Sequence, residues 1–208
     1  MAARVSIYVD GFNLYYGALK AHPEVRWLDL GALGARLFPG SVVTIRYVTA
    51  RVSAARDAHA QGRQKLYLQA LETVPNLTAH FGHFTVQHSW MPLANPSATG
   101  ARTVEVLKTE EKGSDVNLAT YLLLDGVDRA YDQAVVISDD SDLAEPITQA
   151  AGRFAPVHIL SPRGYTFGAF RAASSIVQLQ RADLAASQFP SPLTLPSGRT
   201  VTRPPRWA

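Results

Sequence analysis

The stretch AVVISDDSD, residues 134–142, joins a strand-like segment to a cluster of acids. Residues 134–137 are apolar, as in a strand that is buried on both faces in a parallel sheet. The apolar residues that follow the cluster are spaced as on a helix. Asp139, Asp140 and Asp142 therefore lie on the turn between a core strand and its covering helix. Open α/β sheets place their ligand sites at such carboxyl ends of strands.

Two interpretations account for acids at this turn. Asp140 or Asp142 can cap the next helix, and Asp142 with Glu145 has the spacing of a capping box. One acid is enough for a cap, however. Three neighbouring carboxylates repel one another unless a cation or protons neutralise them. The cluster therefore favours a bound metal ion.

A second predicted core strand also ends in an acid. Residues 5–10, VSIYVD, are rich in β-formers, and Gly11 permits a sharp turn after Asp10. Residues 12–20 predict a helix with Asn13 in its first turn. The Asn13 amide can orient Asp10, a water or a phosphate, and its alternative role is a helix cap.

A third acid lies near the start of a predicted helix at residues 114–125. Gly113 interrupts the chain, and Ser114 is a typical N-cap residue. Asp115 shares a helix face with Leu118, so docking of this face on the sheet carries the acid toward the protein. A favourable contact with the helix dipole explains an acid at this position equally well.

Strands and helices alternate along the rest of the chain, which is typical of an α/β domain. We expect strands at residues 42–48, 102–108, 156–160 and 176–179, and a half-exposed strand pair at 77–88. We expect helices at residues 29–38, 54–74, 165–173 and 181–186. Residues 89–100, with Pro92, Pro96 and Gly100, predict a flexible flap beside the site.

Three histidines, His80, His83 and His88, raise the alternative of a zinc site. The chain has no cysteine, and apolar residues alternate around the histidines as in a half-exposed strand. We therefore favour a strand over a zinc site.

The composition is that of a globular protein of 208 residues, with 47% hydrophobic and 18% charged residues. The absence of cysteine excludes disulfides and thiolate metal sites. The net charge of +3 permits a polyanionic partner. The apolar runs are too short to span a membrane, and the N-terminus lacks the pattern of a signal or transit peptide. We therefore expect a cytoplasmic protein.

The chain divides into a main domain, residues 1–188, and a tail rich in proline and arginine, residues 189–208. The tail has too few apolar residues to form its own core. Two arrangements are open: an arm laid over the domain and anchored by Trp207, or a loose basic segment.

Three blocks of this sequence, taken together, resemble the signature blocks of the NYN domain family, which belongs to the PIN-like nuclease superfamily. They are YVDGFNLYYG at 8–17, KGSDVNLATYLL at 112–123 and VVISDDSDLAEPI at 135–147. LAASQFPSPL at 184–193 and RPPRW at 203–207 resemble the C-terminal segment of a bacterial subgroup. The resemblance implies a Rossmann-like, three-layer α/β/α sandwich with a mainly parallel sheet. It also implies that acids bind Mg²⁺ or Mn²⁺ to cut RNA.

The resemblance also assigns residues by motif. Asp10 and Asn13 come from the first block, Asp115 from the second, and Asp140 with Asp142 from the third. It implies that all five are catalytic and that the four aspartates bind the metal.

This chain departs from the family pattern at two positions. Asp139 stands where relatives more often have glycine or asparagine, and we treat it as peripheral. Tyr121 stands where some relatives carry another acid, which bears on a second metal. Some members of the family are known mainly through regulatory roles.

These features predict a metal-dependent ribonuclease, with an endonuclease favoured, that acts on single-stranded or looped RNA. Arg51 and Arg163 are candidates for holding the RNA backbone. The first alternative is a catalytically weak module that binds RNA or protein. The second is a metal-dependent phosphatase for small molecules, although its common form needs an aspartate where this chain has Phe12. A homodimer and a protein partner stay open.

Overall fold

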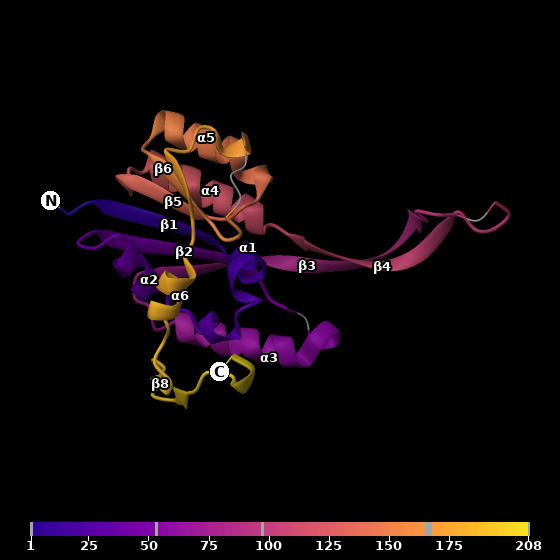
Figure 1. Ribbon diagram of the computed structural model, residues 1–208, viewed down its shortest axis with the longest axis horizontal. Helices are drawn as coiled ribbons and strands as arrows, with labels where there is room; N and C mark the ends of the chain where they lie inside the picture. Colours follow the sequence, from indigo (N-terminus) through magenta and orange to yellow (C-terminus); the bar gives the residue numbers. More distant parts are fainter. Residues whose placement is uncertain (1, 53, 97, 165–167, 208) are drawn as a thin grey trace.

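The computed structural model describes residues 2–52, 54–96, 98–164 and 168–207 (Figure 1). Its large sheet contains β1 (Arg4–Asp10), β2 (Val42–Ala50), β3 (Leu77–Pro92), β4 (Thr103–Lys112), β5 (Gln133–Ile137), β6 (Val157–Ser161) and β7 (Ser175–Gln178). The order across the sheet is β4-β3-β2-β1-β5-β6-β7. Neighbouring strands are parallel except β3 and β4.

Helices cover both faces of the sheet (Figure 1). On one face lie α4 (Ser114–Val127) and α5 (Ala144–Arg153), and on the other α2 (Leu30–Leu37), α3 (Ala54–Leu71) and α6 (Arg181–Ala186). Strand β1 alternates between the two cores: Val5, Ile7 and Val9 pack with α2 and α3, whereas Tyr8 packs with α4 and α5. The predicted three-layer sandwich with a mainly parallel sheet is confirmed.

The direction in which the chain progresses across the sheet reverses between β1 and β5. The chain runs from β1 to its neighbour β2 on one side, and it later returns to β5 on the other side. Val9 pairs with Ile137, so the two strands end at nearly the same height. Such a reversal opens a crevice at the carboxyl ends of the strands. Both acidic turns predicted from the sequence begin there.

Strands β3 and β4 form a long antiparallel hairpin that projects away from the body of the domain (Figure 1). The ladder runs from His83 opposite Lys112 to Pro92 opposite Thr103. Residues 89–92 therefore belong to a strand, and the prediction that the flap begins at residue 89 is wrong. The cross-strand ladder satisfies the backbone up to Pro92, which stands at the strand end where a proline is tolerated.

The first predicted helix, at residues 12–20, is divided into two short segments. They are α1 (Gly11–Leu14) and a π-helical turn at Tyr15–Leu19. The helix expected at residues 165–173 lies partly outside the described residues, and Gly168–Phe170 forms a 3₁₀ turn. In the described parts of the chain, the structure has no helix with the length and apolar character needed to cross a membrane.

The segment after residue 188 lies over the domain as an arm. Trp207 is buried, and its ring centroid lies 6.2 Å from that of Trp27 and 6.1 Å from that of Tyr67. Phe189 packs on Trp27 at 5.7 Å between ring centroids. Of the two arrangements considered for this segment, the structure therefore has the anchored arm.

A largely buried ion pair fastens α4 to the sheet. Asp125 of α4 accepts hydrogen bonds from the Tyr8 hydroxyl at 2.7 Å and from Arg46 Nε at 2.6 Å. The Arg46 guanidinium also lies 4.6 Å from the ring centroid of Tyr121. These contacts fix the helix that carries Asp115 in its first turn.

Replacing Asp125 with asparagine is expected to lower the free energy of unfolding by about 2–3 kcal/mol. The substitution leaves the Arg46 charge without its carboxylate, which is costly for a buried pair. The expected loss of free energy is smaller than is usual for breaking a fully buried ion pair, because the Arg46 side chain is 29% exposed. Urea unfolding followed by circular dichroism measures the change.

The matched control is Asp132→Asn, because Asp132 pairs with Arg4 on the surface and both side chains are 48% exposed. This change should lower the free energy of unfolding much less than Asp125→Asn does, because an exposed ion pair contributes little to stability. Equal losses in the two variants would contradict the role assigned to Asp125.

Candidate metal centre

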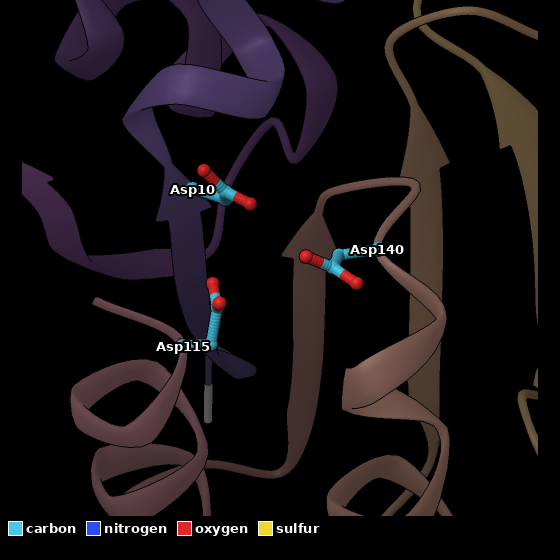
Figure 2. Close-up of side chains that lie close together, drawn as sticks. All are labelled: Asp10, Asp115 and Asp140. Atoms are coloured by element: carbon cyan, nitrogen blue, oxygen red, sulfur yellow. The ribbon is translucent and has the colours of Figure 1, made fainter. Parts of the chain in front are cut away.

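Three aspartates converge at the crevice between β1 and β5. Asp10 ends β1, Asp115 lies in the first turn of α4, and Asp140 follows β5. Each offers a carboxylate oxygen, and these oxygens all lie within 4.8 Å of one another. Figure 2 shows the three carboxylates facing a common space.

Asp10 is held from two sides. It is 6% exposed, its Oδ1 accepts from the Asn13 backbone N–H at 2.9 Å, and its Oδ2 accepts from Ser138 Oγ at 3.0 Å. Ser138 Oγ also accepts from the Asp140 backbone N–H at 3.1 Å. Ser138 therefore links the acid of β1 to the turn that carries Asp140. Asp10, and not Asn13, supplies the cap of α1.

Asn13 and Asp139 connect the loops around the cluster. Asn13 Oδ1 accepts from the Asp139 backbone N–H at 3.0 Å, and Asp139 Oδ2 accepts from the Arg163 backbone N–H at 2.9 Å. Asp139 is 5% exposed. The structure therefore gives Asp139 a positioning role: it fixes the loop after β6.

Gly11 is needed because the chain passes close to β2. A Cβ atom at this position would lie 2.7 Å from the Tyr47 ring and 3.0 Å from the Val48 carbonyl oxygen. The reason for glycine is therefore close approach, because Gly11 does not adopt a positive φ. Any larger residue would displace the turn that orients Asp10 and Asn13.

Helix α4 begins differently from the prediction. Its N-cap is Gly113, with φ of 92°, and Ser114 is the first helical residue. The Ser114 hydroxyl donates to Glu111 Oε1 at 2.8 Å. The prediction of Ser114 as N-cap is wrong, because its side chain bonds back to β4 instead of to the helix. This contact ties the start of α4, and so Asp115, to the hairpin.

Two acids of the site, Asp10 and Asp115, have raised pKa values. The pKa of Asp115 rises to about 6 because of burial and then repulsion by other carboxylates, first Asp10 and Asp140. Burial also raises the pKa of Asp10, although hydrogen bonds from Asn13 and Ser138 act in the opposite direction. A metal-free site therefore disfavours the fully ionised cluster.

This donor set fits a divalent cation. Carboxylate oxygens are the ligands that hard cations such as Mg²⁺ and Mn²⁺ prefer. A positive charge among Asp10, Asp115 and Asp140 would offset both the burial of these carboxylates and the repulsion between them. The geometry brings together three of the four aspartates predicted to bind metal.

Asp142, the fourth predicted ligand, is exposed and lies outside this group of three. Its backbone N–H donates to Asp140 Oδ1 at 3.0 Å, so Asp140 caps the 3₁₀ turn Ser141–Leu143 while it also faces the cluster. The negative charge of Asp142 contributes, as the last of the causes, to the raised pKa of Asp115. Its role as a ligand stays a prediction.

The two arginines predicted to hold RNA are placed differently. Arg163 lines a pocket of about 350 Å³ together with the three aspartates and Asn13. The Arg51 guanidinium lies 4.4 Å from the Phe81 ring centroid and is not among the described residues that line this pocket.

Tyr121 and the histidines have other partners. Tyr121 packs on His80, with 3.9 Å between ring centroids, and under the Arg46 guanidinium. His88 Nδ1 lies 2.9 Å from Glu105 Oε1 on the projecting hairpin. Tyr121 thus serves the contact between α4 and the sheet.

Sequence reasoning missed several residues that line the pocket: Phe12, Tyr16, Phe84, Glu111 and Ser114. The spacing of Phe12 and Tyr16, four residues apart, could have indicated a shared helix face. Phe84 and Glu111 reach the pocket through the register of β3 and β4, in which they are paired. That register is not readable from the sequence.

Comparisons with known proteins agree with this architecture. The chain is 28% identical to 6-hydroxy-3-succinoylpyridine 3-monooxygenase HspA of Pseudomonas putida (strain DSM 28022 / S16), across 98% of this chain and 75% of that protein. A crystal structure of VPA0982, a protein of unknown function from Vibrio parahaemolyticus RIMD 2210633, superposes with a TM-score of 0.57 at 17% identity. That match covers 86% of this chain and 94% of the other, and shows a shared fold.

A family model covers most of the chain. The model of the NYN domain matches residues 4–179, a range that includes all three clustered aspartates. NYN domains are PIN-like and generally nucleases, in agreement with the acidic crevice. The chain therefore belongs to the NYN domain family.

Proposed function

We propose that this protein is a metal-dependent ribonuclease that hydrolyses phosphodiester bonds within RNA chains. The observation that carries the proposal is the convergence of Asp10, Asp115 and Asp140 within 4.8 Å at the crevice between β1 and β5. Family membership supports a nuclease-like function. RNA as the substrate, cleavage within the RNA chain, and Mg²⁺ or Mn²⁺ as the cation are parts of this proposal.

The residues of the crevice have distinct roles in this proposal. Asp10, Asp115 and Asp140 hold the cation, and Asp142 adds negative charge from the rim. When bound, the cation supplies Lewis-acid stabilisation of the charge that develops on the phosphate oxygens and makes water more acidic. Ser138 positions Asp10 and Asp140, and Asp139 positions the loop that carries Arg163, through the hydrogen bonds described above.

Asn13 and Arg163 are suited to contact the substrate. Asn13 Oδ1 is already engaged by Asp139, so the amide can offer its Nδ2 hydrogens to a phosphate oxygen or a water. The Arg163 side chain is exposed beside the pocket, where a guanidinium can pair with phosphate. Both residues would orient the scissile group relative to the carboxylates.

The Pseudomonas relative supports a second candidate, oxidation of a heteroaromatic compound. That protein is named a monooxygenase, and the similarity extends over nearly the whole of this chain. We rank this candidate lower because the clustered ligands are carboxylates, which suit hard cations such as Mg²⁺ or Mn²⁺ and not softer metals such as copper. Oxygen uptake that depends on a reductant and a hydroxypyridine would favour it over nucleic-acid hydrolysis.

Asp140→Asn is expected to reduce RNA cleavage by at least roughly 100-fold, the scale seen when a group that stabilises transition-state charge is removed. The assay follows labelled single-stranded and looped RNA in Mg²⁺, in Mn²⁺ and with chelator, beside single-stranded DNA. Wild-type cleavage should stop with chelator. RNA binding by the variant should persist.

Glu145→Gln is the matched control, because Glu145 is exposed on α5 and bonds to Gln149. Its cleavage rate should equal that of the wild type. Unchanged cleavage by Asp140→Asn would refute the metal mechanism. RNA binding without cleavage in any protein would favour the regulatory module instead.

Metal affinity is expected to fall as the pH drops through about 6. Carboxylate ligands bind a cation in the ionised form, and burial with neighbouring acids raises the pKa of Asp115 to about 6. Mn²⁺ binding, followed by electron paramagnetic resonance, should strengthen between about pH 5 and pH 7. Asp115→Asn should bind Mn²⁺ more weakly and lose this part of the pH dependence.

The same raised pKa has a consequence for the metal-free protein. A carboxyl with a raised folded-state pKa contributes stability that is present below about pH 4 and lost as the pH rises through about 6. Metal-free Asp115→Asn should lack this loss and melt about 2–4 °C above wild type at pH 7. A lower melting temperature in the variant would show that the ionised Asp115 carboxylate does not destabilise the metal-free protein.

A further inference from the structure

Three aromatic rings line the same pocket as the carboxylates. We call Phe12, Tyr16 and Phe84 the aromatic wall. Phe12 and Tyr16 follow Asp10 on consecutive helical turns, and Phe84 comes from β3. The pocket volume of about 350 Å³ falls within the range of small-ligand sites.

Phe12 contacts both of the other rings. Phe12 and Tyr16 are nearly parallel, with an interplanar angle of 24° and 6.4 Å between centroids. Phe84 meets Phe12 edge to face at 5.8 Å. Because these contacts orient the rings, the wall has a defined shape.

The aromatic wall does not serve the core of the protein. In the described part of the chain, neither hydrophobic core includes Phe12, Tyr16 or Phe84. Tyr16 is 54% exposed, and Phe12 and Phe84 are half-buried. Leaving apolar rings in contact with water sacrifices the free energy that their burial would yield. Rings in this position are suited to cover a ligand.

Two positively charged side chains lie close to the aromatic wall. Lys20 Nζ lies 4.8 Å from the Tyr16 ring centroid, and Arg163 lines the pocket. The pocket thus combines the three clustered carboxylates, aromatic rings and the positive charge of Arg163, and Lys20 adds a second positive charge beside Tyr16. A nucleotide matches this combination, because it joins an anionic phosphate to a planar base.

We infer that the aromatic wall stacks the nucleobase next to the scissile phosphate. The inference rests on the proposed nuclease function and deepens it by assigning the base-binding surface. Bases of a duplex stack on one another, whereas an unpaired base offers a free face. The wall therefore selects a substrate with an unpaired nucleotide at the cleavage site, and Tyr16, its most exposed ring, contacts the base directly.

The test compares the binding of adenosine 5′-monophosphate with that of ribose 5-phosphate in the presence of Mg²⁺, by isothermal titration calorimetry. Both carry the phosphate, and one carries the base. Wild-type protein should prefer the nucleotide by roughly 5- to 100-fold, the range for one stacked base. Tyr16→Ala should lose most of this preference, and Tyr16→Phe should keep it because the ring is retained.

Trp90→Ala is the control for loss of an exposed aromatic side chain, because Trp90 is 67% exposed on the projecting hairpin. It should keep the wild-type preference. Equal affinity of wild type for the two phosphates, or a full preference in Tyr16→Ala, would overturn the inference. The binding test does not depend on cleavage. RNA cleavage without a base preference would refute base stacking by the aromatic wall and support the nuclease function. A base preference without RNA cleavage would support base stacking and count against the nuclease function.

Discussion

Electrostatic repulsion among three carboxylates is the constraint that organises the crevice of this protein. Asp10, Asp115 and Asp140 come from three elements, yet their oxygens lie within 4.8 Å of one another. Burial and then the neighbouring like charges raise the free energy of the ionised site, as the raised pKa of Asp115 indicates. A fold keeps such an arrangement when its packing fixes the acids and a cation offsets their charge.

The surrounding structure holds the acids in place. Strands β1 and β5 end side by side, and Ser138 joins Asp10 to the turn of Asp140. Asp125, bonded to Tyr8 and Arg46, fastens the helix that presents Asp115. Asp10 ends β1, Asp140 follows β5 and Asp115 lies in the first turn of α4, so elements packed in the core position all three acids.

Much of this arrangement could be predicted from the sequence, because it depends on local patterns. The apolar stretches before Asp10 and Asp140 predict core strands, and parallel strands bring their carboxyl ends to one edge. Gly113 predicts the break before α4. The aromatic wall could not be predicted, since Phe84 reaches it through the register of β3 with β4, a long-range pairing without a local signal. The buried role of Asp139 depends on the loop after β6, a long-range contact without a local signal.

The central claim is that Asp10, Asp115 and Asp140 together hold one divalent cation. The most direct test is a crystal structure with Mn²⁺, with anomalous scattering recorded near the manganese absorption edge. The account predicts an anomalous peak between these three carboxylates, with oxygen ligands at about 2.0–2.3 Å. An anomalous peak only at another site would contradict the claim that these three aspartates hold the cation. Ordered carboxylates with no peak between them at saturating Mn²⁺ would also contradict it.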